Sequence, residues 1–224
     1  MCVYTSKFVT EKHTTMKNVF LLTIIAALFV ACGSPSASTE AGDAQEAAEA
    51  TSTNETYTIA ADQSTVVWKG TKPTGDSHSG TVAVKDGSIS AENGVPTAGN
   101  FSIDLTTIAL TDEGMDEESK AKLVGHLSTG DFFETEKYPT ASFEITEVSS
   151  DSLTGNLTIK ETTKSITVPY FFQAENGEAT ATASFSIDRT LWGITFNSGN
   201  FFKNLGEYMI DDAIQFDVKL KGTK

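Results

Sequence analysis

The chain of 224 residues has few cysteines, few histidines and few basic side chains, and each shortage excludes a class of protein. Only two cysteines are present, both near the amino terminus, so disulfide bonds cannot hold the fold together. The 16 Lys and Arg residues face 30 Asp and Glu residues, which gives a net charge of −14. A protein that follows nucleic-acid phosphates needs a basic surface, so no nucleic-acid partner is expected. The fold must rest on burial of the 39% of residues that are hydrophobic.

Catalytic motifs are missing as well. The sequence has no G-x-S-x-G, H-E-x-x-H, P-loop or G-x-G-x-x-G pattern. Its three histidines, His13, His78 and His126, have no metal-ligand spacing, so neither a metal nor another cofactor is expected. His126, beside Leu127, is most simply a half-buried structural side chain. The alternative is that it bonds a ligand head group at the mouth of an apolar cavity.

One uncharged apolar run lies near the amino terminus, from Val19 to Ala31. Its thirteen residues are too few for a membrane-spanning helix, which needs about 20, and they match the core of a signal peptide. Lys17 precedes the run and a small residue ends it, as such signals require. Residues 1–31 are therefore predicted to be a signal peptide. Met16 is a more natural start than Met1, because it lies just before this signal.

The cysteine that follows the run points to lipid attachment. Phe29-Val30-Ala31-Cys32 resembles the bacterial lipobox, in which the chain is cut before a cysteine that is then acylated. Phe29 stands where Leu is usual. The alternative is a plain secretory signal whose cleavage site carries a cysteine. Because two lipid signals suffice for stable attachment, an acylated Cys32 predicts an exported bacterial lipoprotein of the outer membrane, on its periplasmic or cell-surface side.

The next segment, Gly33 to Thr56, contains no Val, Leu, Ile, Met, Phe, Trp or Tyr. Such a composition buries too little apolar surface to offset the entropy of ordering the chain. Residues 32–56 are thus expected to form the lipidated cysteine and a disordered acidic linker that holds the folded part away from a membrane.

Residues 57–224 show the period-two alternation of strands with one buried face. It is clearest in 101–105, 141–145, 181–188 and 214–221, and strands buried on one face are typical of antiparallel sheets. Three pairs favour tight hairpin turns: Asp86-Gly87, Asn93-Gly94 and Asn176-Gly177. Eight to ten strands are predicted in an all-β fold, a barrel or a sandwich. An exported protein gains from having no open sheet edge, which favours the closed barrel.

One segment breaks the strand pattern. Residues 116–127 have amphipathic spacing, with Glu117 and Glu118 near the start, which suits a helix dipole and predicts one short helix. Adjacent phenylalanines at 132–133, 171–172 and 201–202 either lie at strand ends or line a cavity. An eight-stranded barrel can fill its interior or enclose one ligand, and periodicity leaves that choice open.

Four ordered stretches resemble the YceI-like family. The first is Gly125-His126-Leu127 through Asp131-Phe132-Phe133 to Tyr138-Pro139 and Phe143; the others are Leu153 to Ile159, Thr163 to Val168, and Phe185 to Ile194 with its I-D-R-x-x-W-G run. The resemblance covers most of residues 57–222. Lys160-Glu161 replaces the family's usual hydrophobic-Gly pair, a departure that concerns the local turn.

The resemblance implies a lipocalin-like, up-and-down antiparallel β-barrel with one helix, holding a polyisoprenoid, an isoprenoid quinone or a similar long-chain lipid. It brings no catalytic residues, so a non-enzymatic lipid-binding or lipid-carrying protein is expected. The candidate ligand-binding residues are the inward registers plus one histidine: Trp68, Phe101, Ile103, Phe143, Ile145, Leu157, Ile159, Ile166, Val168, Phe185, Ile187, Phe216 and His126. Arg189, next to Asp188, is expected to form a structural ion pair, and the alternative is a contact with the ligand head group.

Two rival functions remain at this stage. The first is a structural or interaction module whose barrel is filled by side chains. The second is an enzyme that modifies a lipid through His126 and nearby acids. The sequence also leaves open whether the chain forms a homodimer.

Overall fold

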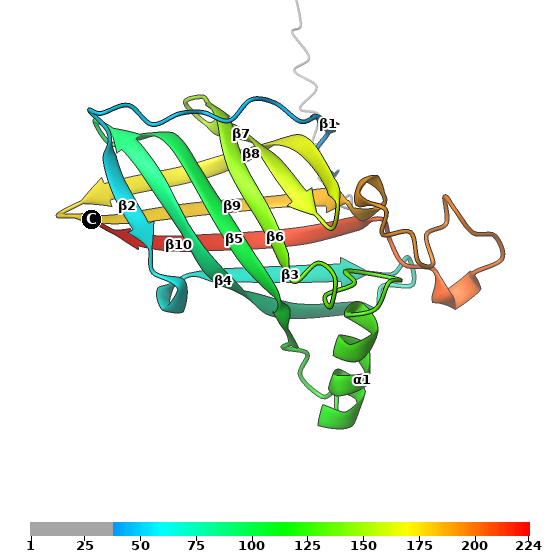
Figure 1. Cartoon of the computed structure of the whole chain (residues 1–224). Coiled ribbons are helices and arrows are strands. Elements are labelled where there is room, and N and C mark those ends of the chain that lie inside the picture. Colours follow the sequence, from blue (N-terminus) through cyan, green and yellow to red (C-terminus); the bar gives the residue numbers. More distant parts are fainter. Residues whose placement is uncertain (1–37) are drawn as a thin grey trace, which may run out of the picture. The chain divides into compact units, whose positions relative to one another are not determined.

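The computed structural model of the chain describes residues 38–224 (Figure 1), so the predicted signal peptide and Cys32 lie outside the described residues. The strands are β1 Ala41–Asp43, β2 Glu55–Ile59, β3 Thr65–Thr71, β4 Ser77–Glu92, β5 Val95–Leu110, β6 Thr140–Val148, β7 Ser152–Ile159, β8 Thr162–Glu175, β9 Glu178–Asp188 and β10 Ala213–Thr223. The α-helix is α1, Glu117–Leu127, and three 3-10 turns are η1 Ala61–Gln63, η2 Arg189–Trp192 and η3 Gly206–Tyr208.

The strands close into a barrel. Every strand pairs antiparallel with its neighbours from β3 through β10, and β10 returns to pair with β3. β2 also pairs with β4 and β10, so β2 and β3 occupy one position in the ring, interrupted by η1. The result is an eight-stranded closed antiparallel barrel with one short helix, and the predicted fold class is confirmed.

Two of the three predicted tight turns are present. Asn93 and Gly94 have φ angles of 52° and 78°, and Asn176 and Gly177 have 53° and 83°. A two-residue hairpin turn with both central φ angles positive matches the twist of the strands it joins, and Asn-Gly suits it best. These turns connect β4 to β5 and β8 to β9.

The predicted turn at Asp86-Gly87 is wrong. Both residues lie inside the single long strand β4 and pair with Ser102 and Phe101 of β5, next to a shift in register. A Cβ on Gly87 would lie only 2.6 Å from the carbonyl oxygen of Asn100. Gly87 therefore allows β4 and β5 to approach each other closely. From the sequence alone, a glycine in this role cannot be distinguished from a glycine in a turn.

Helix α1 begins and ends where its residues predict. The Asp116 side chain caps the amino end by accepting a hydrogen bond from the Ser119 amide, 2.9 Å away. Glu117 and Glu118 lie in the first turn, as expected. α1 contacts β5 beside one end of the barrel. No helix in residues 38–224 is both long and apolar enough to cross a membrane.

The segment before the barrel differs from the disordered linker that its composition predicts for residues 32–56. β1 pairs with the first half of β8, Ala41 opposite Ile166, and the Thr39 amide donates to the Ser186 carbonyl at 2.7 Å. β8 and β9 pair with each other only from Tyr170–Ala183 to their turn, so the strands part beyond that point. Residues 39–43 lie in this gap, and we call residues 38–48 the strap, because the chain continues from the gap across β7 to β6, where the Ala48 amide donates to the Ile145 carbonyl at 2.9 Å.

Side-chain hydrogen bonds hold the strap further along. The Gln45 amide donates to Asn156 Oδ1 at 2.9 Å, and Asn156 Nδ2 donates back to the Gln45 carbonyl at 2.7 Å. Asn156 is buried although its neighbours Gly155 and Leu157 occupy the inward register. Backbone groups can order a segment that has almost no apolar residues, which explains why composition misleads here.

Candidate ligand-binding cavity

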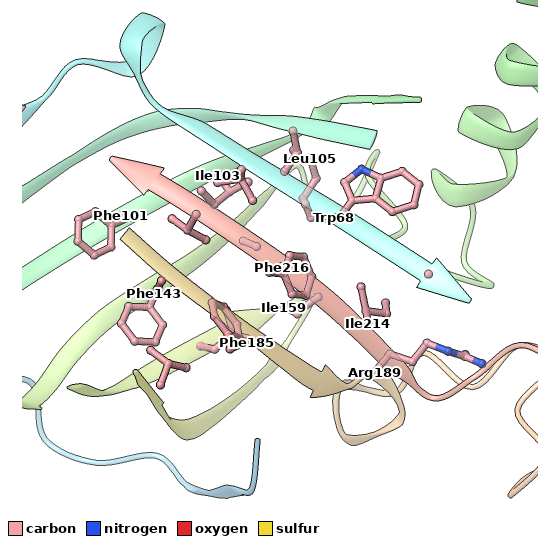
Figure 2. A pocket seen from close by; sticks show the side chains of 18 of the residues that line it. Trp68, Phe101, Ile103, Leu105, Phe143, Ile159, Phe185, Arg189, Ile214 and Phe216 are labelled. Atoms are coloured by element: carbon pink, nitrogen blue, oxygen red, sulfur yellow. The ribbon is translucent and has the colours of Figure 1, made fainter. Parts of the chain in front are cut away.

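The barrel encloses a cavity of about 280 Å³, and its wall is formed by the inward side chains of the strands. Figure 2 shows Trp68, Ile103, Phe143, Phe185 and Phe216 around this space, each from a different strand. Alternation along each strand sends one side chain in two to the interior, and here those side chains are almost all apolar. The site therefore offers dispersion contacts and exclusion of water, with few polar groups.

Ten of the thirteen predicted ligand-binding residues lie on the cavity wall: Trp68, Phe101, Ile103, Phe143, Ile145, Leu157, Ile159, Val168, Phe185 and Phe216. Their placement follows from the alternation that predicted them. That they contact a ligand stays a prediction. Further wall residues lie outside the predicted set, among them Val66, Val82 and Leu105 from strands and Leu123 from α1. Phe132 and Phe133, one of the phenylalanine pairs for which a cavity lining was an open alternative, are on the wall as well.

Ile166 and Ile187 do not line the cavity. Both are buried to 1% exposure and belong to the packed core together with Trp192 and Ile194. The Trp192 indole Nε1 donates to the Leu157 carbonyl at 3.0 Å. Trp192, from the 3-10 turn after β9, thus packs inside the barrel. The alternation of residues along strands cannot predict this, because Trp192 does not lie on a strand.

His126 lies outside the cavity wall. Its Nε2 is 3.1 Å from Asp131 Oδ2, and its ring packs edge-on against Phe132 and Phe196, with centroids 5.1 and 4.8 Å apart. Of this group, Phe132 reaches the cavity. The histidine therefore supports the loop at the barrel end, which matches its interpretation as a structural side chain.

Two glycines set the position of aromatic rings in the wall. Trp68 lies opposite Gly80 in the β3–β4 register, and a Cβ on Gly80 would lie 2.7 Å from the Trp68 ring. Gly155 likewise leaves room for the Phe143 ring, where a Cβ would clash. The Phe143 ring stacks on Phe101, with centroids 6.4 Å apart. These rings therefore lie flat along the wall, which keeps the interior open.

A polar cluster marks one edge of the cavity. His78 Nδ1 is 2.7 Å from Asp112 Oδ2, and the Ser79 amide donates to Asp112 Oδ1 at 2.9 Å. Burial alone would raise the pKa of the Asp112 carboxyl, but hydrogen bonds from His78 and Ser79 outweigh it and hold this pKa below its ordinary value. Asp112 is thus an ionised anchor between β4 and the chain that leads to α1.

Arg189 closes the same end of the barrel from the other side. Its guanidinium, 1% exposed, donates to the carbonyls of Ile194 at 2.7 Å and Ile210 at 3.2 Å, and lies 3.4 Å from Asp212 Oδ1. Burial lowers the pKa of Arg189, and the neighbouring aspartates oppose that shift. The expected structural ion pair is formed with Asp212. Asp188 instead caps η2.

Cation sites are not apparent in the described part of the chain. Within residues 38–224, no group of three His, Cys, Asp or Glu side chains is arranged to hold a metal ion. One buried side-chain polar atom in this range, Trp68 Nε1, has no hydrogen-bond partner. The interior of residues 38–224 is thus lined mainly by apolar side chains.

Comparisons with known proteins agree on the family. The YceI-like domain profile matches residues 57–222. A "UPF0312 protein" of Pseudomonas putida is 28% identical over 152 residues, which cover 65% of this chain and 73% of that protein. A "UPF0312 protein" of Pseudomonas aeruginosa is 36% identical over 87 residues, 37% of this chain and 42% of that protein.

Two solved structures share the fold. BcnA of Burkholderia cenocepacia is 19% identical with a TM-score of 0.53, over 74% of this chain and 99% of that one. A polyisoprenoid binding domain from Saccharophagus degradans, implicated in plant cell wall breakdown, is 13% identical with a TM-score of 0.55, over 75% of this chain and 97% of that one. At these identities the likeness concerns the barrel fold alone.

Proposed function

The chain belongs to the YceI-like domain family, and from this premise we propose that it binds a polyisoprenoid, an isoprenoid quinone or a similar long-chain lipid inside its barrel. The observation that carries the proposal is the apolar cavity of about 280 Å³ inside the barrel, lined from every side of the barrel. Ligand pockets commonly measure about 300–1,000 Å³, so this one suits a slender chain more than a bulky ring system.

The affinity would come from the chain of the ligand. Each methylene of the ligand that is buried contributes roughly 0.8 kcal/mol to the binding free energy, and this contribution requires no polar contact with the wall. A head group would remain near the end of the cavity where His78 and Arg189 lie. The ligand is therefore recognised by its apolar length, and its head group can vary.

The rival functions have less support. If the protein were an interaction module with a filled barrel, its interior would have no cavity. The cavity of about 280 Å³ therefore favours lipid binding. An enzyme that acts on a bound lipid through His126 would need this side chain at the cavity wall, and His126 does not line the cavity. The comparisons indicate no enzyme family.

Anchoring to a membrane through an acylated Cys32 is a second part of the proposal. It is supported by the lipobox-like Phe29-Val30-Ala31-Cys32 that follows an apolar run of signal-peptide length. The lipid-binding barrel would then act at the surface from which its ligand comes. Mass spectrometry of the amino-terminal peptide of protein purified from native membranes would detect the acyl chains, and an unmodified cysteine would overturn this part alone.

Organic extraction of the same purified protein tests the lipid-binding part. We expect about one long-chain lipid per chain, identified by mass spectrometry of the extract. Absence of stoichiometric lipid, together with no binding of an added isoprenoid quinone, would overturn the proposal.

A further inference from the structure

Exposed aromatic side chains gather on one loop at the end of the barrel. In this end loop, which we define as residues 195–209, Phe201, Phe202 and Tyr208 are 58%, 48% and 66% exposed. The Phe201-Phe202 pair takes no part in the cavity wall, in contrast to Phe132 and Phe133. Large exposed apolar side chains that lie close together mark contact surfaces more often than single ones do.

The end loop is firmly held at its base. Arg189 bonds the carbonyls of Ile194 and Ile210, the residues that flank the loop. Within the loop, the buried Ser198 accepts hydrogen bonds at its carbonyl from the amides of Phe201 at 3.1 Å and Phe202 at 2.9 Å. The two phenylalanines are thus displayed outward by a turn with specific hydrogen bonds.

The end loop stands beside one end of the cavity, where we infer its entrance. Wall residues at this end include Gly70 and Thr71 of β3, and Ile210 and Asp211, which follow the loop. Thr71 Oγ1 donates to Asp211 Oδ2 at 2.7 Å, and this bond ties the loop to β3. Figure 1 shows the loop, in orange, projecting beyond the end of the barrel where β3 finishes and β10 begins. A surface touched by these aromatic side chains would therefore lie at the cavity entrance.

The start of the described chain is held at this end too. The Thr39 amide donates to Ser186, three residues before Arg189. Six residue steps separate Ser38 from Cys32, and a chain of that length spans at most about 21 Å. If Cys32 carries the acyl chains, the membrane surface cannot be far from the end loop. This step rests on the proposed anchor.

We propose that the end loop docks on a lipid bilayer, with Phe201, Phe202 and Tyr208 in the interfacial region and the cavity entrance turned toward the lipid. Aromatic rings favour that region, where an apolar body meets a wet boundary. The loop carries one cation, Lys203, and one anion, Glu207, so its attraction is apolar and not electrostatic. A long-chain lipid could then pass between bilayer and barrel without crossing water.

Vesicle sedimentation with the predicted mature chain, residues 32–224 carrying Cys32→Ser, tests the docking without help from acyl chains or from the apolar run Val19–Ala31. The probe is vesicles of phosphatidylethanolamine and phosphatidylglycerol at a ratio of three to one. We expect Phe201→Ser/Phe202→Ser in that background to reduce the bound fraction at least tenfold. Phe171→Ser is the matched control, because Phe171 is 60% exposed but lies on β8, and it should leave binding unchanged. Binding of the parent should persist in 1 M salt.

Three results would overturn the docking. They are equal vesicle binding by the double variant, loss of parent binding in high salt, and a dimer in sedimentation that the double variant abolishes, which would assign the loop to self-association. Unchanged unfolding midpoints show that the variants fold. Lipid extraction from the same variants separates the two proposals, because a double variant that keeps its bound lipid leaves the cavity function standing whatever the vesicles show.

Discussion

The two ends of the barrel are built in different ways. At the hairpin end, Asn93-Gly94 and Asn176-Gly177 close the strands with two-residue turns, and Tyr57, Ala91 and Ala179 pack into a small cluster close to them. At the loop end, His126 of α1 packs against Phe196 of the end loop, and Arg189 links the two segments that flank that loop. The hairpin end is therefore closed by local turns, whereas the loop end combines one local turn, Lys160-Glu161 between β7 and β8, with long-range contacts.

The different construction of the two ends predicts different effects of mutations on stability and on ligand exchange. The barrel wall and its hairpin end follow from local sequence features, namely the alternation of apolar and polar residues and the Asn-Gly turns. At the loop end, the cavity wall includes Thr71, Ile210 and Asp211. Entry and exit of a ligand at this end would therefore depend on segments outside the alternating strand pattern.

Ile89, Pro96 and Phe172 carry the cavity wall toward the hairpin end as well. Changes at the loop end should therefore affect both stability and ligand exchange, and changes at hairpin-end residues outside the wall, such as Tyr57, should affect stability alone.

The largest effect is expected at Arg189. Arg189→Met would leave the carbonyls of Ile194 and Ile210 without a donor and Asp212 without its partner, at a cost of about 3–5 kcal/mol in the free energy of unfolding. Arg189→Lys should cost less, because it keeps the charge but cannot bond both ends of the loop. Denaturant unfolding measures both. A loss within about 0.5 kcal/mol for Arg189→Met, the range of ordinary surface substitutions, would contradict the role given to this side chain.

A comparable but separate effect is expected at the hairpin end. Tyr57, 2% exposed, packs edge-on against Phe172, with ring centroids 6.4 Å apart. Tyr57→Ala should cost about 3 kcal/mol, because it empties a packed site. The amount of lipid per folded chain should stay the same, as measured by extraction. If lipid content fell along with stability, the two ends would not be functionally distinct.

The sequence predicts the strands and their inward side chains better than it predicts the segments outside the strand pattern. Alternation placed ten wall residues correctly in the interior, from Trp68 to Phe216. It also placed Ile166 and Ile187 inside the barrel, but both belong to the packed core, which includes Trp192 from outside the strand pattern, and neither lines the cavity. It failed for the strap because backbone pairing with β8 needs no apolar residues.

The smallest effect concerns pH at the cavity edge. Hydrogen bonds from His78 and Ser79 keep the pKa of Asp112 below its ordinary value in the folded protein, although burial opposes them. The resulting stabilisation is present above the unfolded-state pKa of about 3.9 and is lost as pH falls through the lower folded-state pKa. Asp112→Asn should therefore cost about 1 kcal/mol at pH 7 and progressively less toward pH 3. Urea unfolding at several pH values checks this, and a constant difference would show that the charge of Asp112 does not matter.

The most direct test of the lipid-binding cavity compares two neighbouring residues of β9. Ala183 lines the cavity, and Ser184 points away from it to solvent. Ala183→Phe and Ser184→Phe add the same ring on opposite sides of the barrel wall, and unfolding midpoints verify that both variants fold. Titration with an isoprenoid quinone should show at least tenfold weaker binding for Ala183→Phe and unchanged binding for Ser184→Phe. Equal binding by both variants, or no binding by the parent protein, would contradict a lipid site inside the barrel.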